Sequence, residues 1–283
     1  MRINAVLAAL LAAMVVGPVA AAKRRDDPPA QTATVTTVTA PESVAVRHRG
    51  AWNRLAPGGK LAEGDEIHTG PTSIVGVRFS DGSTITVMPY SQVVVANLGT
   101  RSGRVQLALK IGEVTGRIKP KRASLPDFNI GTGTALASLR GTDFAVFVDT
   151  GYGATLVSIR HGAAEVDPAF AGFATVDVPA GKEVEVTRSK VSPVAAVGRA
   201  GALPGGVNRE RARALVLASL RKTVAGCELS PESFAFKIDT AANTWRVSIR
   251  VSGAISGWGV WTVVGTKVAT SNPLAKRIAA GCR

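Results

Sequence analysis

The chain has 283 residues, and its 34 Lys and Arg against 20 Asp and Glu give a formal net charge of +14. Apolar residues make up 46% of the sequence and charged residues 19%, which is typical of a folded protein and excludes an intrinsically disordered chain. Two cysteines are too few for a disulfide-dense miniprotein or a four-cysteine metal site. The length fits a leader followed by one or two domains.

Residues 1–22 have the pattern of a signal peptide. Arg2 is the positive end, an apolar run follows, and Ala20, Ala21 and Ala22 form a small-residue cleavage site. We therefore expect cleavage after Ala22, which would leave a periplasmic or secreted chain of charge +13 without a transmembrane helix. The alternative is an uncleaved leader that stays as a membrane anchor.

An exported location predicts that Cys227 and Cys282 form a disulfide, because oxidising compartments favour one between the only two cysteines. Closing this loop should stabilise the fold by about 4 kcal/mol in the chain-entropy model. We expect the bond to join the ends of two helices.

Residues 23–43 are rich in Pro, Thr and Ala without apolar periodicity, which predicts a flexible lead-in. Residues 44–187 then alternate apolar and polar side chains in short runs separated by Gly-containing turns, as in Val75, Val77 and Phe79 before Asp81-Gly82. This pattern predicts an all-β domain with a hairpin turn at Asp81-Gly82.

Residues 188–206 form a Pro-, Ala- and Gly-containing linker, and residues 207–283 have a different pattern. Asn208 is a candidate helix N-cap, and Asn272-Pro273 has the signature of a second helix start. Between them, alternating runs predict a hairpin and a third strand over 258–264. We therefore expect a small α+β domain of order α-β-β-β-α.

Several short motifs occur in order along the β region. They are GDEIHTG from Gly64, VRFSDGS from Val77, GEV from Gly112, RGTDF from Arg140, HG at His161-Gly162 and AGK from Ala180. Together they resemble the FecR domain family across about residues 44–187. The family pattern falls on Gly64, Asp65, Thr69, Gly70, Asp81, Gly82, Arg140, Gly141 and Thr142.

The resemblance implies a twisted β-solenoid or sandwich of hairpins and a non-catalytic role in the cell envelope. The best-known members of the family span the membrane and relay a transporter signal to a sigma factor. Here only Met1 to Asn4 precede the apolar run, so we expect a stand-alone exported protein of this kind. The family's proline before the RGT motif is also absent, because Thr132-Gly133-Thr134-Ala135 stands there.

Several polar residues are candidates for chemistry, and the sequence gives a structural interpretation of each. Asp65, Asp81 and Asp143 adjoin Gly or Thr, where an aspartate commonly accepts hydrogen bonds from its own turn. Arg140 could contact an anion or brace a turn. His48, His68 and His161 are far apart and lack neighbouring ligands, so we expect neither a metal, a cofactor nor an enzyme active site.

The positive charge is the clearest functional signal in the composition. Arg117, Lys119, Lys121 and Arg122 cluster around Pro120 and are candidate contacts for an anion. The alternative is a solvated basic face. Nucleic acid is disfavoured by the exported location and by the 5% aromatic content. Among the tryptophans, Trp258 between two glycines is a candidate partner contact.

Two functional hypotheses follow. The first is a FecR-domain protein that binds an envelope protein in sensing, signalling or assembly. The second is a protein that binds anionic envelope polymers or lipid head groups through basic surfaces. Binding that weakens strongly in salt would favour the second hypothesis.

Overall fold

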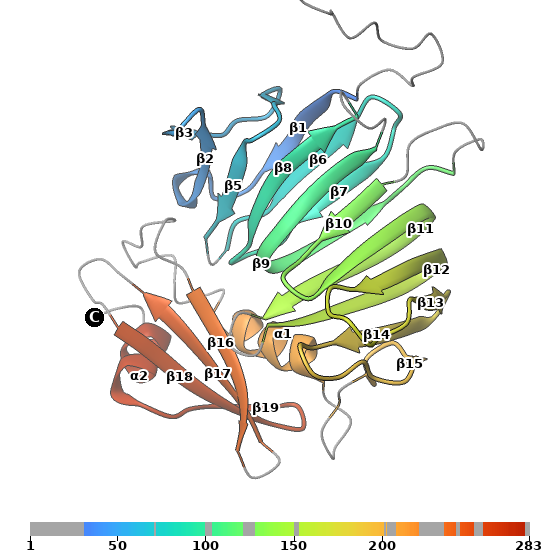
Figure 1. Cartoon of the computed structure of the whole chain (residues 1–283). Helices are drawn as coiled ribbons and strands as arrows, with labels where there is room; N and C mark the ends of the chain where they lie inside the picture. Colours follow the sequence, from blue (N-terminus) through green and yellow to red (C-terminus); the bar gives the residue numbers. More distant parts are fainter. Residues whose placement is uncertain are drawn as a thin grey trace, which may run out of the picture.

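The computed structural model of the chain consists of a large β domain and a smaller α+β domain (Figure 1). It describes residues 31–70, 72–99, 104–120, 128–149, 153–200, 202, 208–220, 235–241, 244–251 and 257–280. The predicted leader and both cysteines lie outside these ranges. Within them, no helix is long and apolar enough to cross a bilayer.

The large domain is built from strands β1 to β15 and one 3-10 turn over Pro41–Ser43. The strands are β1 (Ala33–Val38), β2 (Val44–His48), β3 (Ala51–Arg54), β4 (Lys60–Leu61), β5 (Glu66–Thr69), β6 (Val75–Phe79), β7 (Thr84–Val87), β8 (Gln92–Leu98), β9 (Val105–Arg117), β10 (Phe128–Gly131), β11 (Ala135–Asp149), β12 (Ala154–Pro168), β13 (Val176–Pro179), β14 (Lys182–Val186) and β15 (Ala195–Ala196). Except for the parallel β9–β10 pair, neighbouring strands are antiparallel.

Three long strands, β9, β11 and β12, each belong to two layers of the domain. One half of each long strand belongs to a sheet with the order β3-β2-β5-β8-β9-β10-β11-β12-β13, which we call the first layer. The other half belongs to a sheet with the order β4-β1-β6-β7-β9-β11-β12-β14-β15, which we call the second layer. The domain is therefore a twisted sandwich whose two sheets continue into each other.

The core lies between the two layers. It contains the inward members of the predicted alternations, such as Val75, Val77 and Phe79 on β6. Phe79 meets Phe128 of the first layer edge to face, with ring centroids 5.1 Å apart. The predicted all-β domain is thus confirmed, and the β6–β7 hairpin turns at Asp81-Gly82 as expected.

The predicted flexible lead-in is wrong for its second half. β1 pairs with both β4 and β6, and its Ala33 and Val35 are buried in the core. The run Thr34 to Val38 consists of β-branched residues, and this strand propensity outweighs the composition that suggested a linker. Residues 23–30 lie outside the described part of the chain.

The smaller domain contains α1 (Arg209–Leu220), β16 (Ala235–Ala241), β17 (Thr244–Val251), β18 (Gly257–Val264), β19 (Lys267–Thr270) and α2 (Pro273–Ala279). Asn208 Oδ1 accepts from Arg211 N, and Asn272 Oδ1 accepts from Ala275 N, so both predicted N-caps are present. The order is α-β-β-β-β-α, because Lys267 to Thr270 form a fourth strand that the sequence analysis missed. That strand is short and has no apolar run, so periodicity could not reveal it.

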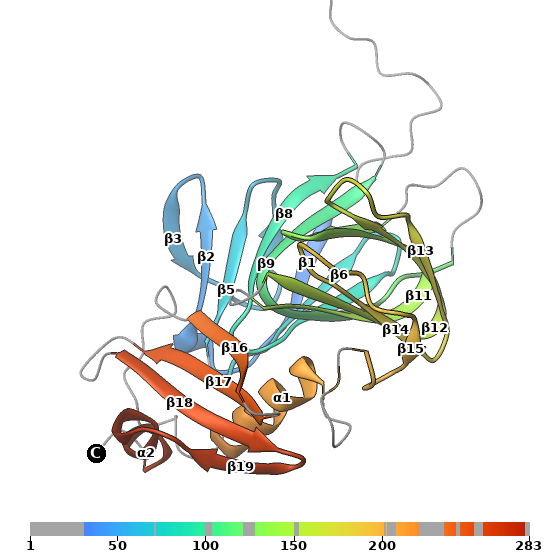
Figure 2. The same ribbon diagram turned by 60° about the horizontal axis from the view of Figure 1, so that its bottom comes forward.

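The helix α1 lies between the small sheet and the large domain (Figure 2). Ala212, Val216 and Leu220 of α1 join one buried apolar cluster with Phe147 of β11 and Leu156 of β12. The described part of the predicted linker also packs on the large domain, since β15 pairs with β14. The two domains therefore share an apolar core and are not joined by a flexible linker alone.

Candidate functional site: the contact between the two domains

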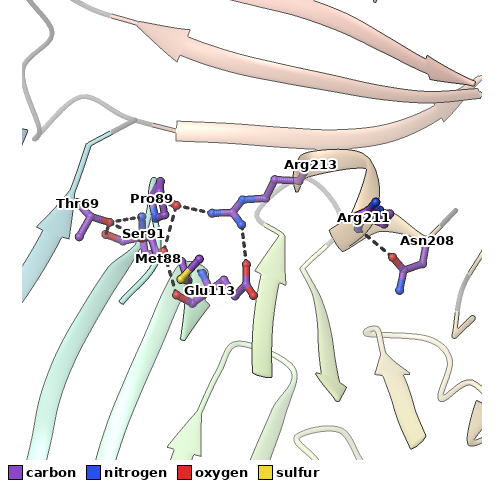
Figure 3. Close-up of polar contacts among 8 residues, drawn as sticks. All are labelled: Thr69, Met88, Pro89, Ser91, Glu113, Asn208, Arg211 and Arg213. Atoms are coloured by element: carbon purple, nitrogen blue, oxygen red, sulfur yellow. Dashed lines mark hydrogen bonds and ion pairs between the residues drawn. The ribbon is translucent and has the colours of Figure 1, made fainter. Parts of the chain in front are cut away.

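Arg213 of α1 is the central polar residue of the contact between the domains. It is 2% exposed, and its Nη1 donates to Glu113 Oε2 at 3.0 Å while its Nη2 donates to the carbonyl oxygen of Pro89. Figure 3 shows the side chain reaching from the helix to both acceptors. The guanidinium also lies over Phe147, with Cζ 5.4 Å from the ring centroid. Burial lowers the pKa of Arg213, and Glu113 and Glu210 oppose this effect.

The loop that receives Arg213, residues 88–91, is held in place by Thr69 and Ser91. Thr69 Oγ1 donates to Met88 O at 2.6 Å and accepts from Ser91 N at 2.9 Å. The Ser91 hydroxyl oxygen in turn accepts from Glu113 N at 2.9 Å (Figure 3). These hydrogen bonds hold the loop with Pro89 O beside the Glu113 backbone, so both acceptors of Arg213 lie on neighbouring elements.

Two glycines allow this loop to lie close to the strands. Gly112 has φ +95, and a Cβ there would lie 2.2 Å from Ser91 Oγ. Gly70 accepts from Tyr90 N at 3.1 Å and donates to Ser43 O at 2.7 Å. Tyr90 adopts φ +54, a left-handed conformation that costs a non-glycine residue about 1 kcal/mol or more. Burial of its ring raises the pKa of its hydroxyl.

Carboxylates surround the contact. Glu210, in the first turn of α1, has a pKa raised to about 7 by burial and by the neighbouring charges of Glu113 and Glu183, against the effect of Arg213 and Arg211. Glu183 of β14 is buried and accepts from Ala200 N at 2.7 Å, from Ser158 Oγ at 2.8 Å and from the Asn208 side chain at 3.3 Å. The site thus holds excess negative charge around one buried arginine.

A polar contact also joins the small sheet to the large domain. Asp149 Oδ1, at the end of β11, accepts from the backbone N of Ile238 on β16 at 3.3 Å. Ile238 belongs to the apolar cluster that α1 shares with the large domain. Helix and sheet of the smaller domain are therefore both tied to the large one.

The aspartates of the predicted motifs divide into two roles. Asp65 Oδ2 accepts from Ala62 N at 2.8 Å after Gly64, and Asp81 accepts from Ser83 N at 2.8 Å beside Gly82, so both stabilise their own turns as expected. Asp143 does not stabilise a turn, so the turn role predicted for it is wrong. It lies inside β11 and binds Arg117 of β9 through two hydrogen bonds of 2.7 and 2.6 Å.

The RGT motif lies where β11 passes from the first layer to the second. Gly141 has φ +60, and Thr142 Oγ1 donates to Ala163 O at 2.8 Å and accepts from Arg140 N at 3.1 Å. The pairing with β12 shifts between Arg140 and Asp143, which is a β-bulge. Opposite it, Gly162 has φ +78, and a Cβ there would lie 2.4 Å from Gly141 O. This motif bends the sandwich and does not form part of the domain contact.

Of the four candidate anion contacts, the structure describes Arg117 and Lys119. Arg117 is engaged by Asp143, whose pKa its hydrogen bonds lower. Beside this pair is an open hollow of about 310 Å³ lined by Thr84, Thr115 and Arg160. Lys119 is exposed near Gly82, while Lys121 and Arg122 lie outside the described residues.

Residues 65–165 match the family model described as FecR protein. This part of the chain is therefore similar to a FecR domain. The motifs described above lie within this range, except for Gly64 at its border and the later Ala180 to Lys182 turn. No curated protein sequence matches the chain.

Solved structures with a similar arrangement include two crystal structures of a candidate anti-sigma factor from Parabacteroides distasonis. Each has 16% sequence identity and a TM-score of 0.40, and the alignment covers 46% of this chain. The matched part spans 59% of those chains.

The large domain also carries a polar cluster that the sequence patterns did not indicate. Glu66 of β5 is buried, and it accepts from Lys110 Nζ at 2.7 Å and binds Arg47 and His68. Burial alone would raise the pKa of Glu66, but hydrogen bonds from His68 and Lys110 outweigh it and lower the pKa to about 2. Trp52 meets His68 edge to face, with centroids 4.6 Å apart. The cluster ties β2, β3, β5 and β9 together.

Among the described residues, no group of three or more His, Cys, Asp or Glu side chains is placed to hold a metal ion. The sequence signal for the domain contact was weak. Arg213 is one of several arginines in α1, and Glu113 drew attention only as part of the GEV motif. The predicted disulfide between Cys227 and Cys282 lies outside the described residues and stays a prediction.

Proposed function

We propose that this protein is a non-catalytic FecR-domain protein that binds another protein of the cell envelope in sensing, signalling or assembly. The FecR match supports a regulatory role, since the family's known members are regulators. The observation that carries the proposal is the buried contact of Arg213 with Glu113 and Pro89. It makes the FecR domain and the smaller domain one unit, so binding on either can affect the other.

We further propose that the protein acts in the periplasm or outside the cell. The apolar run and the Ala20 to Ala22 pattern support export. Cell fractionation, with the mature N-terminus sequenced, tests this part. A new N-terminus at Lys23 is expected, and an intact chain in the cytoplasm would contradict export.

The partner can be sought with the tagged chain from Lys23 onward, incubated with envelope extract in low and then high salt. We expect a discrete protein that stays bound in high salt and that binds again when both proteins are purified. Arg213→Met should weaken this binding, because it loosens the contact between the domains. Arg211→Met, a change at an exposed arginine of the same helix, is the matched control.

Polymer retained only in low salt would overturn the proposal and favour the binding of anionic polymers. If a purified partner binds Arg213→Met and Arg211→Met equally, the proposed protein interaction stands, but the contact between the domains has no role in it.

A further inference from the structure

The outer face of the small sheet carries two of the four large apolar side chains that are exposed in the described part of the chain. Along β18, Trp261 and Val263 point inward and are 1% exposed, whereas Trp258 and Val264 point outward and are 42% and 60% exposed. Val260 and Thr262 lie between them on the same outward side and are partly exposed. The helices α1 and α2 cover the opposite face through Ala212, Val216 and Ile278.

The same domain carries more than half of the protein's net positive charge. Residues 208–283 contain 12 Lys and Arg against 4 Asp and Glu, whereas residues 44–187 contain 15 against 13. On the outer face, Lys267 of β19 is exposed and pairs in register with Val264. Arg246 of β17 is also exposed and pairs with Thr262. Basic side chains therefore flank the row of Trp258 and Val264.

This combination fits a lipid surface better than a soluble polymer. A polyanion in water would attract the basic side chains, but it would leave the exposed tryptophan and valine in contact with water. An anionic bilayer offers both phosphates for the cations and an apolar boundary, where tryptophan is enriched. We propose that the outer face of β17, β18 and β19 docks on an anionic lipid bilayer, with Trp258 and Val264 entering the headgroup region. This inference is independent of the protein-binding role proposed above.

The proposal can be tested with vesicles and the tryptophan fluorescence of the chain from Lys23 onward. Vesicles of phosphatidylglycerol and phosphatidylcholine should bind the protein, and vesicles of phosphatidylcholine alone should bind it much more weakly. Trp245 and Trp261 are buried in the core, and the partly exposed Trp52 belongs to β3 of the large domain, outside the proposed surface. Brominated lipids should therefore quench mainly Trp258. Trp258→Ala should lower the partition coefficient by about tenfold. Lys267→Gln should lower it by about fivefold.

Two matched controls lie outside the proposed surface. Val197→Ser changes an exposed apolar residue after β15, and Arg54→Gln changes an exposed basic residue on β3. Both should leave the partition coefficient within about twofold of the wild type. A thermal melt of each variant separates loss of folding from loss of binding, and Trp258→Phe should retain most of the affinity.

Four outcomes would overturn the proposal. A well-folded Trp258→Ala variant could bind anionic vesicles as well as the wild type, or neutral vesicles could bind equally. Dextran sulfate could compete fully while Trp258→Ala has no effect, which would identify a polymer site. Light scattering could show a dimer that Trp258→Ala dissociates, which would mean that a second copy covers this face.

Discussion

Arg213 Nη1 lies 3.0 Å from Glu113 Oε2, although the two residues are 100 positions apart and belong to different domains. Both side chains are largely buried, so each ion depends on the other. A buried pair contributes little compared with apolar side chains of the same shape, but the removal of one partner strands a charge. The pair therefore specifies how the smaller domain sits on the large domain.

Arg213→Met should destabilise the chain by about 3–5 kcal/mol, because Glu113 loses its only described cationic hydrogen-bond partner. Urea denaturation measures the loss, and faster hydrogen exchange in α1 would locate it at the contact. Arg211→Met should cost less than about 0.5 kcal/mol. Glu113→Met in the Arg213→Met background should recover part of the stability. If Arg213→Met and Arg211→Met were equally stable, the ion pair would not fix the contact.

Glu210 should make the stability of the chain fall as the pH rises. Its pKa is raised from 4.5 to about 7, so the folded state keeps a proton that the unfolded state releases. The stabilising effect is complete below pH 4.5 and is lost as the pH rises to about 7, a change of up to about 3 kcal/mol. The test compares unfolding free energies at pH 5 and pH 8 for the wild type and for Glu210→Gln. The variant should lose this part of the pH dependence, and parallel curves would contradict the assignment.

Local patterns were enough to predict the elements that local chemistry determines. Asp81-Gly82 specifies a hairpin through a single φ of +84, and Asn272-Pro273 specifies a helix start. The domain contact could not be predicted in this way. Arg213 looks like any arginine of a surface helix, and only the close approach of residues 88–91 and 113 gives it acceptors. β1 was missed because its strand pattern follows a proline-rich stretch.

Glu66, unlike Glu210, should make the stability of the chain fall as the pH is lowered. Its pKa is lowered from 4.5 to about 2, so its ionised form stabilises the folded state above pH 4.5, and this contribution is lost as the pH falls toward 2. We expect a loss of about 2 kcal/mol, less than the full shift implies because Arg47 and Lys110 are half exposed. Acid titration of the unfolding free energy measures it. Glu66→Gln should remove this acid-dependent loss while leaving the dependence between pH 4.5 and 7 unchanged, and a variant that keeps the full acid sensitivity would contradict the prediction.

The bend of the sandwich at the RGT motif should depend on Gly162 more than on any contact of Arg140. An alanine Cβ at position 162 would lie 2.4 Å from Gly141 O and would require a left-handed residue at φ +78. Gly162→Ala should therefore destabilise the large domain by at least about 3 kcal/mol. Gly133→Ala is the matched control, because nothing lies within 4 Å of its Cβ position, and it should change stability by less than about 1 kcal/mol.

Arg140→Ala should behave like the control if the motif acts through its backbone. Urea denaturation of the three variants decides between the alternatives, since a large loss for Arg140→Ala with little for Gly162→Ala would move the role from the bulge to the arginine.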